Sequence, residues 1–232
     1  MMDAITTSLS RQSGLMTEMQ TIANNIANAN TAGFRSAGIT FSEFLNSAGS
    51  VSMSAARAHH FSVSQGALAQ TGGTYDLAIE GDGFFLVETP EGQRLTRAGN
   101  FTPNEMGDLV TMDGHPVLDS GGAPVFVPIG AGSVGIAPDG TISADGQIVG
   151  QVGIWQPADP LTMRRTEGTR FAADGYEPAE GRMVQGFVEQ SNVDPILQIS
   201  RLIEVQRAYE LGQSFSERED ERVRNALGTI TR

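Results

Sequence analysis

The chain has 232 residues, a formal net charge of −12 at pH 7, 15 cationic residues that are all arginine, and no cysteine. The acidic balance argues against nucleic-acid binding, because a phosphate-binding surface needs clustered cations. The lack of lysine and cysteine excludes a P-loop lysine, a Schiff-base lysine, a disulfide framework and a cysteine metal site; the length allows one or two domains.

Residues 3 to about 30 have the period of an amphipathic helix. Their apolar positions alternate steps of four and three, the heptad spacing of a coiled-coil seam. A lone helix with so thin a seam is marginal in water, so it must lie against another element. The seam consists of Ile5, Leu9, Gln12, Met16, Met19, Ala23 and Ile26.

Three asparagines, Asn24, Asn25 and Asn28, crowd the last two turns of this helix, although Asn is a mediocre helix former. Since a buried amide needs a partner, one interpretation is a recognition helix that pairs with specific neighbours; the alternative is a solvated helix end. Gly33 then predicts a helix stop in the left-handed conformation, with Phe34 packing back on the helix.

Residues 36–73 are rich in Ser, Ala and Gly and have few apolar anchors. This composition predicts an extended connector that is partly strand-like. The pair His59-His60 falls in it, but adjacent imidazoles without cysteine make a poor zinc set, so we predict no metal site.

From residue 74 to about 185 the pattern changes to short apolar runs of period two, separated by Asp-Gly turns. Many short strands at this spacing predict a central antiparallel β domain. Trp155, the only tryptophan, is expected in a core strand. The turn pairs are Asp82-Gly83, Asp113-Gly114, Asp139-Gly140, Asp145-Gly146 and Asp174-Gly175.

Residues 186–232 return to a helical pattern, in which Asn192 can cap the helix start and Pro195 fits the first turn. We therefore predict an α+β fold whose long N- and C-terminal helices pair as a coiled-coil-like inner domain, with leftover seams that meet other copies. The C-terminal seam consists of Ile199, Leu202, Val205, Tyr209, Gly212 and Phe215.

Two sequence patterns that could indicate an enzyme are each better explained by structure. The run Gly130–Gly135 matches a dinucleotide-binding glycine pattern, but Pro138 and the turn after it prevent the helix that this fingerprint requires. The carboxylates of Asp76 and Glu80 could in principle serve a hydrolase, but acidic residues are common on turns and this pair does not indicate an enzyme. We therefore predict no catalytic residue, no metal and no cofactor.

No stretch of the chain approaches the roughly 18 apolar residues of a membrane span, so we predict no membrane insertion. The start carries Asp3 and spaced rather than contiguous apolar residues. A cleavable secretory signal is therefore not expected, and any export must use another route.

Three separated motifs carry a family resemblance. Residues 23–35, with the sequence ANNIANANTAGFR, resemble the amino-terminal signature of bacterial flagellar rod and hook proteins. Residues 76–85 and 96–118 resemble the start and the next block of the β domain of that family. Residues 186–193 and 206–210 resemble its carboxy-terminal block. The segment from Val134 to Ser143 is most like the proximal-rod type, with the distal-rod type or a short hook-type axial protein as runner-up.

The resemblance implies a structural subunit that is exported through the flagellar type III apparatus without signal cleavage. Such subunits stack helically with other rod proteins into the hollow rod of the basal body, which crosses the periplasm inside the periplasmic rings and transmits torque. It implies an inner assembly domain from residues 1–35 and 186–232, a connector over 36–73 and a β domain over 74–185. The mixed-charge run Glu217–Arg224 departs from the aliphatic stripe expected in relatives.

Candidate self-association residues follow from the two seams and from these motifs. A secreted β-domain binding or adhesion module with helical tails remains the alternative from a different class. The candidates are Ile5, Leu9, Met16, Met19, Asn24, Asn25, Ile26, Asn28, Gly33, Phe34, Asn192, Val193, Ile199, Leu202, Val205 and Tyr209.

Overall fold

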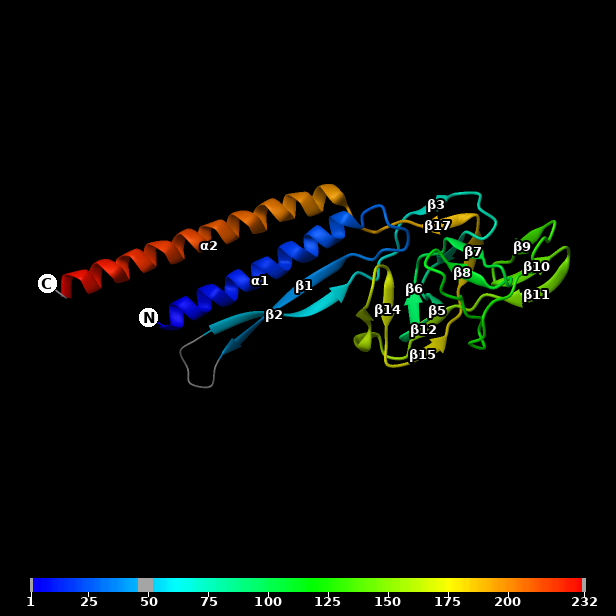
Figure 1. Ribbon diagram of the computed structural model, residues 1–232, viewed down its shortest axis with the longest axis horizontal. Coiled ribbons are helices and arrows are strands. Elements are labelled where there is room, and N and C mark those ends of the chain that lie inside the picture. Colours follow the sequence, from blue (N-terminus) through cyan, green and yellow to red (C-terminus); the bar gives the residue numbers. More distant parts are fainter. Residues whose placement is uncertain (1, 46–51, 231–232) are drawn as a thin grey trace. The chain divides into compact units, whose positions relative to one another are not determined.

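The computed structural model describes residues 2–45 and 52–230 (Figure 1). Its fold is α+β, with helix α1 over Met2–Ala27, helix α2 over Pro195–Ile230 and short strands between them, as the sequence predicted. The chain divides into two compact units. The helical unit comprises the chain up to Ala29, Ser36–Ser62, and the chain from Val193; the β unit comprises Asn30–Arg35 and Val63–Asn192.

This division makes the backbone pass between the units four times, after residues 29, 35, 62 and 192.

The strands are β1 Ala37–Leu45, β2 Ser52–Phe61, β3 Leu68–Gln70, β4 Leu77–Glu80, β5 Phe85–Thr89, β6 Gly92–Thr96, β7 Phe101–Pro103, β8 Leu109–Thr111, β9 Val134–Ile136, β10 Thr141–Ala144, β11 Gln147–Gln151, β12 Trp155–Pro157, β13 Arg164–Arg165, β14 Arg170–Ala172, β15 Tyr176–Pro178, β16 Arg182–Gln185 and β17 Phe187–Glu189, with a 3-10 turn at Pro160–Thr162.

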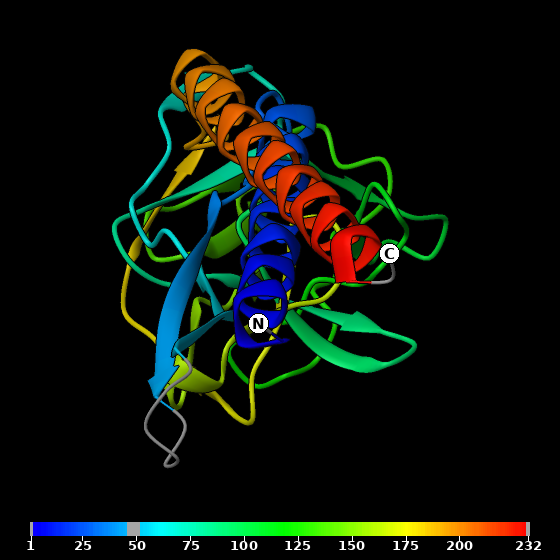
Figure 2. The ribbon, with the colours of Figure 1, turned by 90° about the vertical axis from the view of Figure 1, so that its left-hand side faces the viewer.

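In the helical unit, α1 and α2 lie side by side and run in opposite directions, with the N and C ends of the chain at the same end of the pair (Figures 1 and 2). An ion pair joins the helices, with 2.9 Å between Arg201 Nη2 and Glu18 Oε1. The side chain of Gln12 packs on Gly212, 3.6 Å from where a Cβ would stand. Gln12 of α1 and Gly212 of α2 therefore lie side by side, and a Cβ at position 212 would stand in van der Waals contact with Gln12.

The segment expected as an extended connector differs from that prediction. Strands β1 and β2 form an antiparallel hairpin, with Ala37 opposite Phe61 and a register shift between Thr40 and Phe41. Both strands contact α1. The partly strand-like character was predicted, but the hairpin and its place in the helical unit were not.

The β unit is built of small antiparallel sheets, the largest with the order β13-β14-β6-β5. The rings of Phe85 and Phe101 meet edge to face at 5.0 Å in its core, and Trp155 is buried in β12, as predicted. Phe85 and Phe101 belong to a core cluster whose other members are Leu77, Ile79, Val87, Leu109, Val117, Val125, Val127, Ile136, Ile142, Val152, Ile154 and Met183.

Three of the five Asp-Gly pairs, Asp113-Gly114, Asp139-Gly140 and Asp145-Gly146, form the predicted turns, and φ is positive at their glycines and at Gly83. Residues 130–140 contain strand β9 and turns but no helix. The dinucleotide-type glycine run therefore lacks the helix that would present its amides to a pyrophosphate, as predicted. Among the described residues, neither helix combines the length and apolar content needed to span a bilayer.

Candidate assembly surfaces and the Glu189 cluster

The predicted seam of α1 is divided between two faces of the helix. Gln12, Met19 and Ile26 are half-buried, whereas Leu9 is 58% exposed and Met16 49% exposed. Ala23 is also exposed, and the side chain of Ile5 lies outside the described part of the chain. The alternate heptad positions 9, 16 and 23 therefore form an open stripe on the isolated subunit.

The face that α1 buries inside the chain is one that the heptad count missed. Gly14, Ile22 and Asn25 are buried on it. The period of Leu15 and Ile22, which are seven residues apart, was the available signal. The apolar residues of α1 thus lie on two faces, and within the described part of the chain only one of these faces is covered.

Helix α2 shows the same division. Val193, just before the helix, and Val205 are buried, while Leu202, Tyr209 and Gly212 are half-buried. The opposite side of the helix carries an exposed apolar face, because residues at steps of three and four share one side of a helix. We call Ile196, Ile199 and Ile203 the outer face of α2; Ile196 is 78% exposed. Of the predicted seam, Ile199 and Phe215 are exposed rather than covered by α1.

The three asparagines differ in what they contact. Asn25 is buried; its Nδ2 donates to Ala37 O at 2.8 Å, and its Oδ1 accepts from Ala37 N at 3.0 Å. Asn25 Nδ2 also donates to Gln198 Oε1 at 3.3 Å. Asn28 Nδ2 donates to Asn24 O within the same turn, and Asn24 is exposed. The amide of Asn25 is therefore engaged within its own chain, and a role of the asparagines in register against another copy stays a prediction.

Replacing Asn25 with leucine is expected to destabilise the helical unit by about 1–3 kcal/mol, because the N–H and C=O of Ala37 lose a part-buried partner. Thermal melting followed by circular dichroism at the helix band measures the change. The matched control is Asn24→Leu, the same substitution at the exposed neighbour, which should melt like the wild type. Equal melting of the two variants would contradict this role of Asn25.

The start of α2 also differs from the prediction. Asp194, not Asn192, caps the helix, since its Oδ1 accepts from Ile196 N at 2.9 Å and Leu197 N at 3.1 Å. The side chain of Asn192 instead donates to Ser64 O at 2.8 Å. Asp is as good a cap as Asn, and it stands directly before Pro195, so the sequence carried that signal.

Gly33 and Phe34 are anchored in the β unit. Gly33 has the predicted left-handed conformation, with φ 70, but it lies beyond the turn that follows α1 rather than at the helix end. A Cβ at Gly33 would stand 2.1 Å from Ala98 N. Gly33 N donates to Glu189 O at 2.7 Å, and Phe34 is buried. The prediction that Phe34 packs back on α1 is therefore wrong, since Phe34 packs in the β unit. At position 33, only glycine allows this approach to the Arg97–Ala98 backbone.

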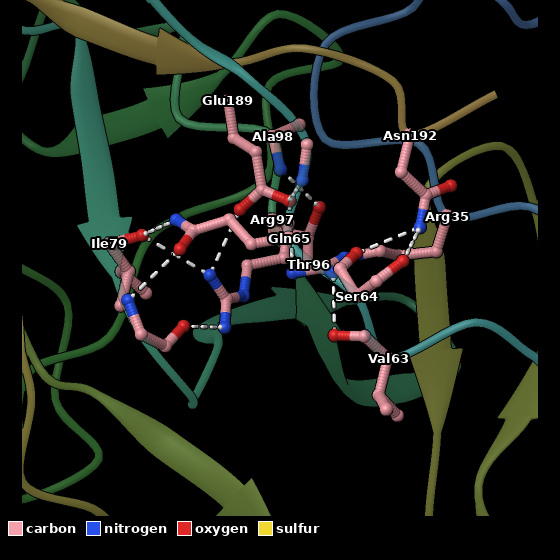
Figure 3. A network of polar contacts seen from close by, with 12 residues as sticks. Arg35, Val63, Ser64, Gln65, Ile79, Thr96, Arg97, Ala98, Glu189 and Asn192 are labelled. Atoms are coloured by element: carbon pink, nitrogen blue, oxygen red, sulfur yellow. Dashed lines mark hydrogen bonds and ion pairs between the residues drawn. The ribbon is translucent and has the colours of Figure 1, made fainter. Parts of the chain in front are cut away.

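A buried carboxylate joins two arginines next to this segment, and we call Arg35, Arg97 and Glu189 the Glu189 cluster (Figure 3). Glu189 is 1% exposed. Its Oε1 lies 2.9 Å from Arg35 Nη2 and its Oε2 2.9 Å from Arg97 Nη1. Gly66 N also donates to Glu189 Oε1 at 3.1 Å. Both oxygens of the carboxylate therefore face a donor, which compensates for its burial.

The guanidinium groups of the Glu189 cluster have further backbone partners. Arg97 Nη2 donates to Gly81 O at 2.6 Å, and Arg35 Nη1 donates to the carbonyls of Val63, at 2.8 Å, and Ser64. Burial lowers the pKa of both Arg35 and Arg97, and the nearby Glu189 carboxylate opposes that shift. Both stay cationic at neutral pH.

Arg165 adds a third, half-buried cation beside the cluster. Its Cζ lies 4.1 Å from the centre of the Phe34 ring and 5.3 Å from that of Phe171, and its Nη2 donates to Arg35 O. Burial lowers the pKa of Arg165 to about 10, so it is protonated at neutral pH. The stacking on two ring faces offsets part of the cost of burying this charge.

The three sequence motifs converge at this place. Gly33, Phe34 and Arg35 come from the first, Arg97 from the second, and Glu189 and Asn192 from the third. Arg97 and Glu189 are 92 residues apart in the chain. All six residues lie within the three motifs, but nothing in the local sequence pattern pairs the two arginines with Glu189.

Comparisons with known proteins agree with this convergence. Residues 5–35 match the family described as flagella basal body rod protein, residues 78–144 the flagellar hook protein FlgE/F/G D1 domain, and residues 184–228 the flagellar basal body rod FlgEFG protein C-terminal. The flagellar basal-body rod protein FlgF of Mesorhizobium japonicum is 40% identical over 218 residues, which is 90% of each chain.

This chain belongs to the flagellar rod and hook protein family. A second relative, FlgF of Caulobacter vibrioides, is 39% identical over 90% of this chain and 89% of its own. The basal-body rod protein FlgG of Bacillus subtilis is 31% identical over 95% of this chain and 96% of its own. The higher identity to FlgF agrees with the predicted likeness to the proximal-rod type. The family is structural rather than enzymatic, as predicted, and the comparisons do not favour an adhesion module.

Proposed function

We propose that this chain is a structural subunit of the flagellar basal-body rod, of the proximal type, which polymerises with copies of itself and with other axial proteins. In this proposal α1 and α2 form a coiled-coil-like inner domain, and the β unit belongs to the outer part of the rod. The antiparallel contact of the two helices and the family membership support this assignment.

The observation that carries the proposal is the exposed apolar surface left on the paired helices. Ile196, Ile199 and Ile203 remain open on the outer face of α2, although α2 already packs on α1. Leu9 and Met16 form the matching open stripe on α1. Apolar rows of this kind favour coverage by another helix, and coverage stabilises the ordered state by mass action.

The subunit reaches the rod, in this proposal, through the flagellar type III export apparatus without a cleaved signal, and it functions inside the periplasmic rings. The likeness of its first motif to the rod-protein amino terminus supports this route. Of the other candidate association residues, Val205 is buried and Met19, Ile26, Leu202 and Tyr209 are half-buried on the paired helices, while Asn24 and Ile199 are exposed and are proposed to contact neighbours.

The test is the double variant Ile199→Asp/Ile203→Asp, expressed in a strain that lacks the gene. We expect a chain with the helicity of the wild type that fails to restore motility and leaves a truncated axial structure in electron micrographs, since two carboxylates cannot be covered by an apolar partner. The control is Gln213→Asp, which adds a carboxylate at an exposed polar position of the same helix and should restore motility. Complete rods from the double variant would reject the proposal.

A further inference from the structure

The segment Asn30–Arg35 leaves the helical unit and forms part of the β unit. Inside the β unit, Phe34 is buried against Arg165, and Gly33 contacts the Arg97–Ala98 backbone. The main chain is fixed at both ends of Phe34, since Gly33 N donates to Glu189 O and Phe34 O accepts from Asn192 N at 3.3 Å. A short segment from one end of the chain thus fills a hole in a unit made mostly of residues 63–192.

The partners of Glu189 separate into two sets. Arg97 and Gly66 belong to the continuous part of the β unit, whereas Arg35 belongs to Asn30–Arg35. If Asn30–Arg35 is withdrawn, Glu189 keeps Arg97 at 2.9 Å, and Arg97 keeps the carbonyls of Ile79 and Gly81. The remaining Arg97–Glu189 pair has one positive and one negative charge, so withdrawal of Asn30–Arg35 leaves no buried carboxylate without a counterion.

Docking of the segment adds charge to this balanced pair. Arg35 places a second guanidinium against the same Glu189 carboxylate, and the side chain of Arg35 is only 3% exposed. Arg165, which packs against Phe34, is a third cation nearby. Because like charges repel and each buried cation loses hydration, the electrostatic gain of docking is partly cancelled. The electrostatic gain that remains at Arg35 and the burial of Phe34 together hold the segment.

We propose that Asn30–Arg35 is a releasable plug of the β unit, seated by Phe34 and locked by Arg35 on Glu189, whose withdrawal leaves the core strands folded. The plug directly follows α1, which ends at Ala27, and its lock residue Glu189 stands shortly before α2, which begins at Pro195. The β unit is therefore complete only when residues from near both ends of the chain are in place.

The test is amide hydrogen exchange followed by mass spectrometry on the full-length chain at low concentration. Arg35→Met keeps an unbranched apolar stem and removes the lock. We expect peptides that cover residues 30–36 and 63–66 to exchange at least about tenfold faster, while β4 and β5 (77–89) stay within about twofold of the wild type. An equal acceleration of plug and core would show one cooperative unit and overturn the proposal, as would an unchanged plug.

Glu189→Gln tests the lock from the other side. It removes the shared carboxylate charge at nearly constant shape, so residues 30–36 should again exchange faster. The double variant Arg35→Met/Glu189→Gln should release the plug no more than the stronger single variant, because both changes break the same contact. Additive acceleration would overturn the lock assignment. The control Glu80→Gln removes the carboxylate of the exposed pair with Arg182 and should leave exchange of the plug unchanged.

Discussion

Replacing Gly33 with alanine is expected to destabilise the β unit by more than about 3 kcal/mol. Two costs add. The φ of 70 places an L-residue in the left-handed region, at about 1–2 kcal/mol. The new Cβ would also stand 2.1 Å from Ala98 N and 2.3 Å from Arg97 C, which are backbone atoms that no rotamer change can move. Urea unfolding of the full chain, followed at Trp155, measures the loss.

Gly72 provides the matched control for this substitution. Its φ is 72, and nothing lies within 4 Å of the position that a Cβ would take. Gly72→Ala therefore carries only the conformational cost, about 1–2 kcal/mol. The difference between the two alanine variants isolates the close approach of the Gly33 segment to the Arg97–Ala98 backbone. If Gly33→Ala proved no worse than Gly72→Ala, the tight packing of this segment would be refuted.

Replacing Val205 with aspartate is expected to separate α1 from α2. Val205 is 3% exposed on the face of α2 that packs on α1, and an unpaired carboxylate at such a position costs several kcal/mol. Since each helix is marginal without a partner, far-ultraviolet circular dichroism should show a large loss of helix. Amide exchange in β4 and β5 should stay near wild type, because these strands belong to the other unit.

The comparison that sharpens this prediction is Ile203→Asp, two residues earlier on the outer face of α2. Ile203 is already 45% exposed in the isolated chain, so its replacement should leave the helical content unchanged and act only on assembly. A loss of helix in both variants would show that the outer face is also covered within the subunit. Retention of helix in Val205→Asp would contradict the assigned contact face.

The elements were predictable from the sequence because their signals are local. Asp-Gly turns and alternating apolar residues identified the strands of the β unit, and Gly33 was identified as left-handed. The hairpin of β1 and β2 was missed, because residues 36–73 offer few apolar anchors and strand pairing depends on α1 beneath it. The face of α1 that is buried within the chain was wrongly predicted, because apolar residues occur on more than one side of the helix. Periodicity alone does not say which side packs against other elements of the same chain.

The Glu189 cluster could not be derived from local pattern at all. Arg35, Arg97 and Glu189 look like ordinary surface charges in sequence, and most such residues are exposed. Their burial depends on pairings made far apart in the chain, such as Leu68 opposite Glu189 in β3 and β17. All three residues lie in the motifs that carry the family resemblance, but only the folded structure shows that they neutralise and position one another.

The four backbone passages between the helical unit and the β unit have a mechanical consequence. A subunit whose parts were joined by one linker would be severed by a single proteolytic cut and would concentrate any pulling force on one peptide segment. Here the chain passes between the units after residues 29, 35, 62 and 192, so one nick leaves the two parts covalently joined. Separating the two units covalently would therefore require more than one cut in the backbone.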